Sequence, residues 1–66
     1  MENFILLHKY NGKVISRFDF GEDLAEAINY IFTIIDNCHQ VGEHKFEVNE
    51  EFSGRNFFNK ECTINW

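Results

Sequence analysis

GEDLAEAINYIFTIIDN, residues 21–37, is the longest periodic segment in this chain of 66 residues. Its apolar residues recur at steps of three and four, as on one face of a helix. That stripe consists of Leu24, Ala27, Ile28, Ile31, Ile34, Ile35 and Cys38. A helix is therefore predicted at about residues 22–37. Since one apolar stripe needs one apolar surface to cover it, the rest of the chain is predicted to form a sheet.

Both ends of the helix carry signals. Asp19 precedes Glu22 by three residues, and Asp23 precedes Glu26 by three, so two capping-box patterns overlap at the start. The first helical residue is uncertain by one turn. At the other end, Asn37 and Gly42 are the residues suited to a left-handed terminus, and the segment between them is predicted to be a loop.

A β-hairpin is predicted at about residues 3–20, because Asn11-Gly12 separates two runs of strand-forming residues and suits a type I′ turn. The turn predicts the pairs Tyr10–Lys13, Lys9–Val14, Leu7–Ser16 and Ile5–Phe18. One face then carries Ile5, Leu7, Val14, Phe18 and Phe20, which we expect to meet the helix.

The other face of this hairpin is too apolar for a surface in contact with water alone. Its apolar members, Phe4, Leu6, Tyr10 and Ile15, are predicted to form an interface, because contiguous apolar patches on soluble domains mark binding surfaces. The alternative is that the helix packs on this face and the choice of core face is inverted.

A second hairpin is predicted at about residues 44–65, with strands at 45–51 and 56–65. A two-residue loop at Ser53-Gly54 would put the apolar residues of the two strands on opposite faces. A three-residue loop, Phe52-Ser53-Gly54 with Gly54 left-handed, puts them on one face and is preferred. It predicts the pairs Val48–Phe58, Phe46–Lys60 and His44–Cys62. Phe58, Cys62, Ile64 and Trp66 then mark one face of the last strand.

These elements predict an α+β fold of order ββαββ. Residues 1–66 form one small domain, in which two hairpins make a four-stranded antiparallel sheet with one helix packed on one face. The sequence does not decide the order of the strands in the sheet.

Composition and charge bound the function. The N-terminal residues lack the features of a signal peptide, no apolar run is long enough to span a membrane, and two cysteines are too few for a disulfide scaffold. A cytoplasmic location with reduced cysteines is expected. The net charge of −5 argues against direct binding to nucleic acid or anionic membranes and is compatible with a protein partner that has a basic surface.

Few residues suggest chemistry. Cys38, His39, His44 and Cys62 are of zinc-ligand type, but their spacing matches no standard zinc motif. Cys38 and Cys62 fall on apolar faces, so buried thiols are the preferred interpretation, with Cys38, His44 and Cys62 kept as weak metal candidates. His8 is expected to be a half-buried strand residue. No catalytic motif is present, and neither an enzyme activity nor a cofactor is predicted.

The polar side of the helix gives a binding hypothesis. Glu22, Asp23, Glu26 and Asp36 are predicted to form an acidic ridge that docks on a basic groove of a partner or mimics nucleic-acid phosphates. The alternative is an ordinary solvated helix face. Lys9, Lys13 and Arg17 gather on the first hairpin, and this uneven charge is compatible with a homodimer.

In style the chain is similar to the accessory proteins that bacteriophages and mobile elements encode against host machinery. The similarity lies in its short length, acidity, lack of proline and abundance of Phe and Asn. It implies a small interaction protein that binds and inhibits or modulates a larger host protein, for example one that binds nucleic acid. The alternative is a structural or regulatory subunit that packs permanently on a partner through the apolar hairpin face.

Overall fold

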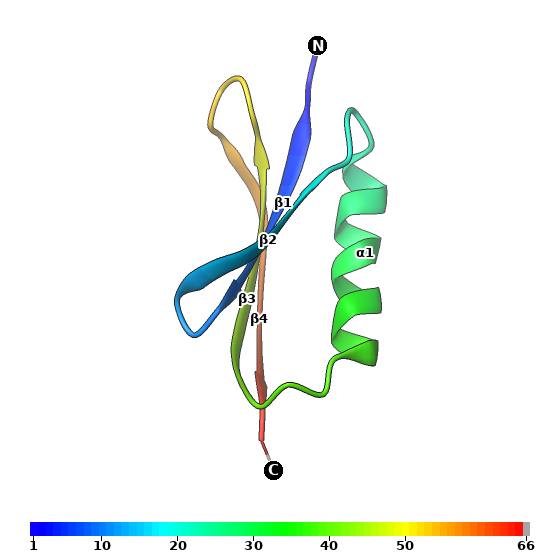
Figure 1. Cartoon of the computed structure of the whole chain (residues 1–66). Coiled ribbons are helices and arrows are strands. Elements are labelled where there is room, and N and C mark those ends of the chain that lie inside the picture. The colour runs from blue at the N-terminus through cyan, green and yellow to red at the C-terminus, as the bar shows by residue number, and fades with distance from the viewer. Residues whose placement is uncertain (66) are drawn as a thin grey trace.

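A computed structural model describes residues 1–65 and confirms the ββαββ fold (Figure 1). The four strands form one antiparallel sheet in the order β2-β1-β3-β4, and the single helix of these residues lies on one face of it. The elements are β1 (Phe4–Tyr10), β2 (Lys13–Asp19), α1 (Leu24–Asn37), β3 (Gly42–Glu50) and β4 (Asn56–Ile64). Trp66, predicted to mark a face of the last strand, lies outside the described residues.

Helix α1 begins at the second of the two predicted capping signals. The Asp23 carboxylate accepts a hydrogen bond from the backbone N–H of Glu26 at 2.9 Å, so Asp23 is the N-cap. The Asp19 carboxylate instead accepts from the N–H of Gly21, which closes the turn before the helix. The predicted left-handed helix end is wrong: Cys38, the C-cap, is extended, and the Asn37 side-chain amide donates to the Thr33 carbonyl at 2.8 Å.

The Asn11-Gly12 turn is confirmed, with φ of 49° at Asn11 and 88° at Gly12. The pairs Tyr10–Lys13 and Lys9–Val14 are also as predicted, but beyond them the predicted register is wrong by one residue. A β-bulge inserts Ile15 between the partners of Lys9 and His8, so that Leu6, and not Ile5, lies opposite Phe18.

The predicted core face of β1 is wrong as well. Phe4 and Leu6, predicted to form an interface, are buried beneath the helix in a core with Ala27, Ile31, Phe46 and Val48. Because the bulge reverses the faces of the distal half of β2, Phe18 packs on this same core, as does Phe20. Of the other two predicted interface residues, Tyr10 is half-buried and Ile15, at the bulge, is 49% exposed.

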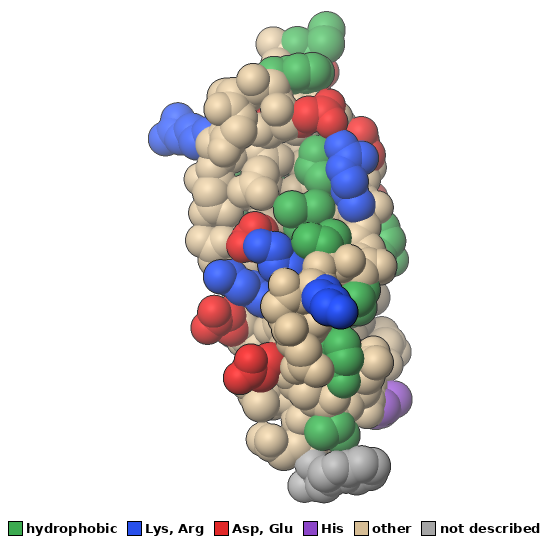
Figure 2. Space-filling view, turned by 60° about the vertical axis from the view of Figure 1, so that its left-hand side comes forward, with side chains coloured by type: hydrophobic (Ala, Val, Ile, Leu, Met, Phe, Trp, Pro, Cys, Tyr) green, Lys and Arg blue, Asp and Glu red, His purple; other side chains and the backbone are tan. Residues whose placement is uncertain are grey.

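On the opposite, open face of the sheet, the apolar residues of the first hairpin make a narrow row. Ile5 is buried there, Leu7 is half-buried and Val14 is 54% exposed. Figure 2 turns this side of the molecule forward and shows hydrophobic side chains running down it with charged side chains among them. An apolar strip of this size is narrower than the interface that the sequence predicted.

The register of the second hairpin is confirmed by the pairs Val48–Phe58, Phe46–Lys60 and His44–Cys62. The three-residue loop is wrong. Five residues, Glu51 to Arg55, join the strands, and a register shift beside Val48 compensates for the longer connection. Gly54 is left-handed as predicted, with φ of 71°.

The β3–β4 loop is held by a buried carboxylate. Glu50 accepts hydrogen bonds from the backbone N–H groups of Asn3, Phe52 and Ser53 at 2.8–3.0 Å. The amide of Phe52, then that of Asn3, with help from Ser53, lowers the pKa of Glu50 from 4.5 to about 2. The loop and the N-terminus are thereby tied to one ionised group.

Glu50→Gln is expected to destabilise the protein at neutral pH and to flatten its acid unfolding curve. Since the folded pKa is depressed, the stabilisation is complete above the unfolded value of 4.5 and is lost as the pH falls toward 2. Urea unfolding at neutral pH and at about pH 3 measures both effects. Glu51→Gln is the matched control, because Glu51 is exposed. Equal acid sensitivity of the two variants would contradict the stabilising role of the Glu50 carboxylate.

Candidate functional site

Charge is divided between the two layers of the molecule. No lysine or arginine lies between Arg17 and Lys45, a stretch that includes the whole of α1 and carries six carboxylates. This stretch has a formal charge of −6, and the remaining five carboxylates and six cations give +1, which together make the net −5. Four of the six, Glu22, Asp23, Glu26 and Asp36, lie on the helix or in the turn before it, and the other two, Asp19 and Glu43, lie on β2 and β3. The helix and the turn before it therefore account for −4 of the net −5.

The four predicted ridge residues are all exposed, and the structure places them at the two ends of the helix. Glu22, Asp23 and Glu26 gather at the N-terminus, where the helix dipole favours carboxylates. Asp36 lies in the last turn, ten residues after Glu26, which is about 15 Å along the axis. Uncharged Asn29 and Thr33 occupy the exposed surface between them. The ridge is therefore an acidic cluster with one distant carboxylate.

Carboxylates on the sheet are treated differently by the fold. Glu47 pairs with Lys9 at 3.0 Å and Glu51 with Arg17 at 2.7 Å, while Glu61 lies 4.0 Å from Lys45. On the face shown in Figure 2, Lys and Arg side chains stand beside Asp and Glu side chains. Within residues 1–65, no ion pair involves a ridge carboxylate. Glu47, Glu61 and the loop residue Glu51 are thus paired with cations, whereas the ridge carboxylates, together with Asp19 on β2 and Glu43 on β3, stay outside these ion pairs.

The position of Asp36 is electrostatically unfavourable for the stability of the helix. A carboxylate in the last turn faces the negative end of the helix dipole, and that turn contains no basic residue. Asp36→Lys is therefore expected to raise the free energy of unfolding by about 0.3–1 kcal/mol in low salt. Chemical denaturation in low and high salt measures this gain, which salt should screen. Thr33→Lys, one turn earlier, is the control, and an equal gain there would contradict the dipole argument.

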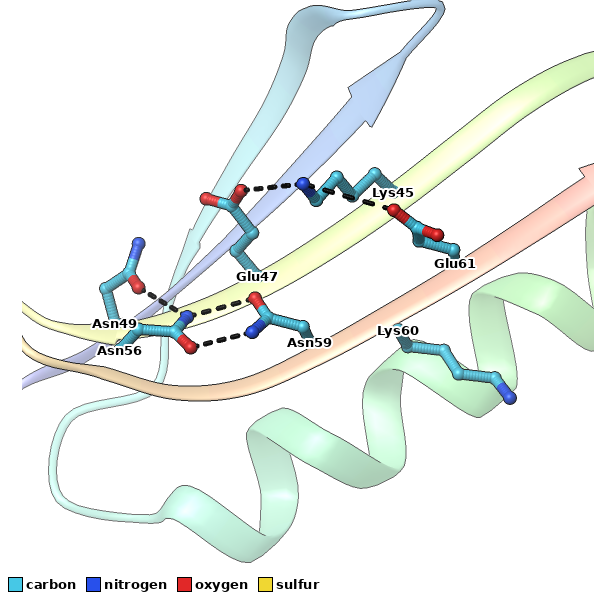
Figure 3. A pocket seen from close by; sticks show the side chains of 7 residues that line it. All are labelled: Lys45, Glu47, Asn49, Asn56, Asn59, Lys60 and Glu61. Carbon is cyan, nitrogen blue, oxygen red and sulfur yellow. Dashed lines mark hydrogen bonds and ion pairs between the residues drawn. The ribbon is translucent and has the colours of Figure 1, made fainter.

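A hollow lies on the open face of β3 and β4 (Figure 3). Its volume is about 650 Å³, and its lining residues are Lys45, Glu47, Asn49, Asn56, Asn59, Lys60 and Glu61. Three of its amides bond one another: Asn56 donates to Asn49 at 2.9 Å, and Asn56 and Asn59 exchange bonds at 3.1 and 2.8 Å. Lys45 lies between Glu47 and Glu61, and the Lys60 ammonium lies over the Phe32 ring on the helix side. These polar groups satisfy one another, so the hollow is not assigned a ligand.

The metal candidates fall in a second polar cluster, beneath the C-terminal end of the helix. The Cys38 sulfur lies 3.8 Å from Nε2 of His44, and Cys62 is the register partner of His44 on β4. Nε2 of His44 also bonds the Gln40 carbonyl at 2.8 Å, and Nδ1 of His44 lies 2.9 Å from Nε2 of His8. His39, in contrast, is exposed. Among residues 1–65, no three His, Cys, Asp or Glu side chains are arranged to hold a metal ion together.

This cluster also contains His8 of β1. His8 was predicted to be half-buried but is only 7% exposed, with its ring stacked on Phe46 at 4.4 Å. Burial, followed by the neighbouring His44, lowers the pKa of His8 from its ordinary 6.5. Hydrogen bonds to His8 and to the Gln40 carbonyl occupy the two ring nitrogens of His44, so the cluster is built as a buried structural network.

Comparison with known proteins gives no further guide, since no family model, curated protein or solved structure matches the chain. Within the described residues, no helix has the length and apolar character that a membrane span requires.

Proposed function

We propose that this protein is a small interaction protein that docks the acidic end of its helix on a basic groove of a larger protein and thereby inhibits or modulates it. The observation that carries the proposal is the distribution of charge. The helix and the turn before it have no cation and keep Glu22, Glu26 and Asp36 exposed and outside the ion pairs of the fold, whereas Glu47, Glu51 and Glu61 are paired with cations. Unpaired carboxylates on a rigid helix suit a partner with complementary charge.

A groove that binds nucleic acid fits this surface best, because such grooves are basic and made to receive rows of anionic groups. Occupation by a protein that is itself acidic would compete with nucleic acid for the groove. This mode of action agrees with the similarity in style to accessory proteins of bacteriophages and mobile elements. A cytoplasmic location is part of the proposal, since both cysteines are free thiols, a state that reducing compartments maintain.

The alternative of a subunit packed permanently through the apolar hairpin face is not proposed. That face was defined by Phe4, Leu6, Tyr10 and Ile15, and two of these four, Phe4 and Leu6, are core residues beneath the helix. What remains exposed of it is the bulge residue Ile15.

The triple variant Glu22→Lys, Glu26→Lys, Asp36→Lys is expected to lose partner binding. The test is retention of proteins from an extract of the natural host on the immobilised chain, followed by elution with increasing salt. Wild type should retain a defined set of basic, nucleic-acid-binding proteins that salt releases, because exposed charge pairs are screened above about 0.1 M salt. The triple variant should retain none of them.

A second triple variant, Glu2→Lys, Glu43→Lys, Glu61→Lys, is the matched control, since it makes the same change in net charge at exposed positions away from the helix. It should retain the same proteins as wild type. If both triple variants lose the set equally, net charge and not the helix surface governs binding; if neither loses it, the ridge is not the docking surface. Either result overturns the proposal.

A further inference from the structure

Helix α1 does not cover the whole sheet. Its Cα atoms come within 8 Å of those of β1, β3 and β4, but not of β2. The side chain of Tyr30 bridges the remaining gap, with its ring 5.0 Å from Phe18 and 5.5 Å from Phe20. Tyr30 is nevertheless 37% exposed, and Phe18 and Phe20 are half-buried. An aromatic ledge thus lies beside the edge strand β2, on the helix side of the sheet.

Strand β2 has a free backbone edge along this ledge. The N–H of Phe20 donates to the Phe4 carbonyl at 2.9 Å, so Phe20 directs its backbone groups toward β1. In an antiparallel ladder this orientation alternates, and Phe18 also faces β1 while Arg17 and Asp19 direct theirs outward. Between the bulge at Ile15 and Phe20 the register is unbroken. Residues 16–20 therefore form a regular free edge.

This edge is complementary to itself. A second copy placed about a two-fold axis at Phe18 would set Arg17 opposite Asp19 of the other copy, twice. Arg17 and Asp19 lie on the same, open face, opposite Leu7 and Ile5 of β1, so each pair of opposite charges would be in contact. Both are outward-facing positions and would exchange backbone hydrogen bonds.

On the helix side, the same register brings the two aromatic ledges together. Phe18 would lie opposite Phe18 of the other copy in a pair without backbone bonds, where side chains approach most closely. Phe20 and Tyr30 of both copies would flank this central pair and cover the surface that α1 leaves open. Arg17 and Asp19 keep their present contacts with Glu51, Asn3 and Gly21, because guanidinium and carboxylate groups have further bonding positions.

The other free edge lacks this complementarity. Strand β4 is longer, and a two-fold register along its full length, Asn56–Ile64, would set Lys60 opposite Lys60 of the other copy. Like charges directly opposite each other are destabilising. Charged residues in the middle of an edge strand are a common protection against pairing.

We infer that the protein forms a two-fold homodimer by antiparallel pairing of β2 with β2 of a second copy, centred on Phe18, which joins the two sheets into one of eight strands. The helices of both copies lie on the same side of the joined sheet, and of the helix residues only Tyr30 is placed at the interface. The dimer does not depend on the proposed function, and it would present two acidic surfaces to a partner.

The test is the mass of the full-length chain by sedimentation velocity over a concentration series, in the presence of a reductant that excludes disulfide-linked pairs. Wild type is expected to show a concentration-dependent dimer. Arg17→Asp should give a monomer, since it sets two carboxylates opposite each other in both pairs. The double variant Arg17→Asp, Asp19→Arg should restore the dimer by exchanging the charges. Circular dichroism confirms that each variant is folded.

Two controls separate pairing from general charge effects. Lys13→Asp makes the same change of charge on β2 beyond the bulge, and Glu51→Gln removes the present partner of Arg17. Both should remain dimeric. The inference is overturned if wild type is a monomer throughout, if Arg17→Asp leaves the dimer intact, if the double variant fails to restore it, or if Lys13→Asp abolishes it equally.

Discussion

Leu6→Ala is expected to lower the free energy of unfolding by about 2–5 kcal/mol, the cost of emptying a fully buried leucine site. Leu6 is 0% exposed and packs beneath the helix with Ile31, Phe46 and Val48. A domain of this size has about 5 kcal/mol of stability or little more. The variant should therefore be largely or wholly unfolded near physiological temperature.

Leu7→Ala is the matched control for this change. It removes the same atoms from the next residue of β1, but from the open face, where Leu7 is only half-buried. A loss of about 1 kcal/mol is expected there, from the transfer term alone. Urea unfolding of both variants measures the difference. Equal losses, or a larger loss for Leu7→Ala, would mean that the helix does not cover the face that contains Leu6.

This pair of variants tests which face of β1 packs on the helix, the feature that the sequence pattern predicted wrongly. Strict alternation after the Asn11-Gly12 turn puts Leu6 and Phe18 on opposite faces of the hairpin. The apolar residues of only one face could then pack against the helix, and those of the other face would stay exposed. The bulge at Ile15 resolves the conflict by bringing both beneath the helix. No residue type between Lys13 and Phe20 indicates a bulge, because this segment contains neither glycine nor proline. The presence of two apolar faces was the available signal, and it was interpreted as an interface.

The parts of the fold that could be predicted depend on local chemistry. The stripe of α1, its cap at Asp23 and the turn at Asn11-Gly12 each arise from neighbouring residues, and each is confirmed. The registers of the second hairpin also follow from the match of its apolar faces. Gly42 shows the limit of this approach, since a Cβ there would meet the Tyr10 ring at 2.7 Å, a contact between β1 and β3 that only the strand order creates.

The candidate site also has one part that follows from local sequence and one part that depends on the order of the strands. The ridge residues could be named from the sequence, because helical periodicity alone puts Glu22, Glu26 and Asp36 on the side away from the apolar stripe. Glu47, Glu51 and Glu61 differ from the ridge residues because they are ion-paired. The partners of Glu47 and Glu51 are far away in the chain, on β1 and β2. That pairing depends on β1 lying between β2 and β3, which the pattern left open.

Strand order also creates the buried histidine pair. His8 and His44 come from β1 and β3, which are neighbours only in the order β2-β1-β3-β4. The Gln40 carbonyl can only accept a hydrogen bond, so Nε2 of His44 carries a proton and its Nδ1 accepts from Nε2 of His8. In this arrangement Nδ1 of His44 carries no proton, and burial disfavours the charged form of His8. A proton on Nδ1 of His44 would oppose the N–H of His8 across 2.9 Å, so full protonation requires the pair to separate.

Acidification is therefore expected to destabilise the protein over the range in which histidine titrates. Since the pKa of folded His8 lies below the unfolded value of 6.5, unfolding takes up protons as the pH falls through that value, and stability declines steadily toward the lower folded pKa. His8→Phe, which preserves the stacking on Phe46, should flatten this dependence. It should also cost about 1–3 kcal/mol at neutral pH, because Nδ1 of His44 loses its donor.

Urea unfolding at a series of pH values between about 7.5 and 5 measures the slope for each variant, and the slope counts the protons bound on unfolding. Tyr10 and Cys38 are the other titratable groups in contact with His44. His39→Phe is the control, because His39 is exposed and its replacement leaves the buried pair in place. A wild-type slope close to zero, or an equal slope in His8→Phe, would contradict the uptake of a proton by His8 on unfolding. A reduced slope in His8→Phe alone would establish that the junction of β1, β3 and the end of α1 depends on an uncharged imidazole at His8.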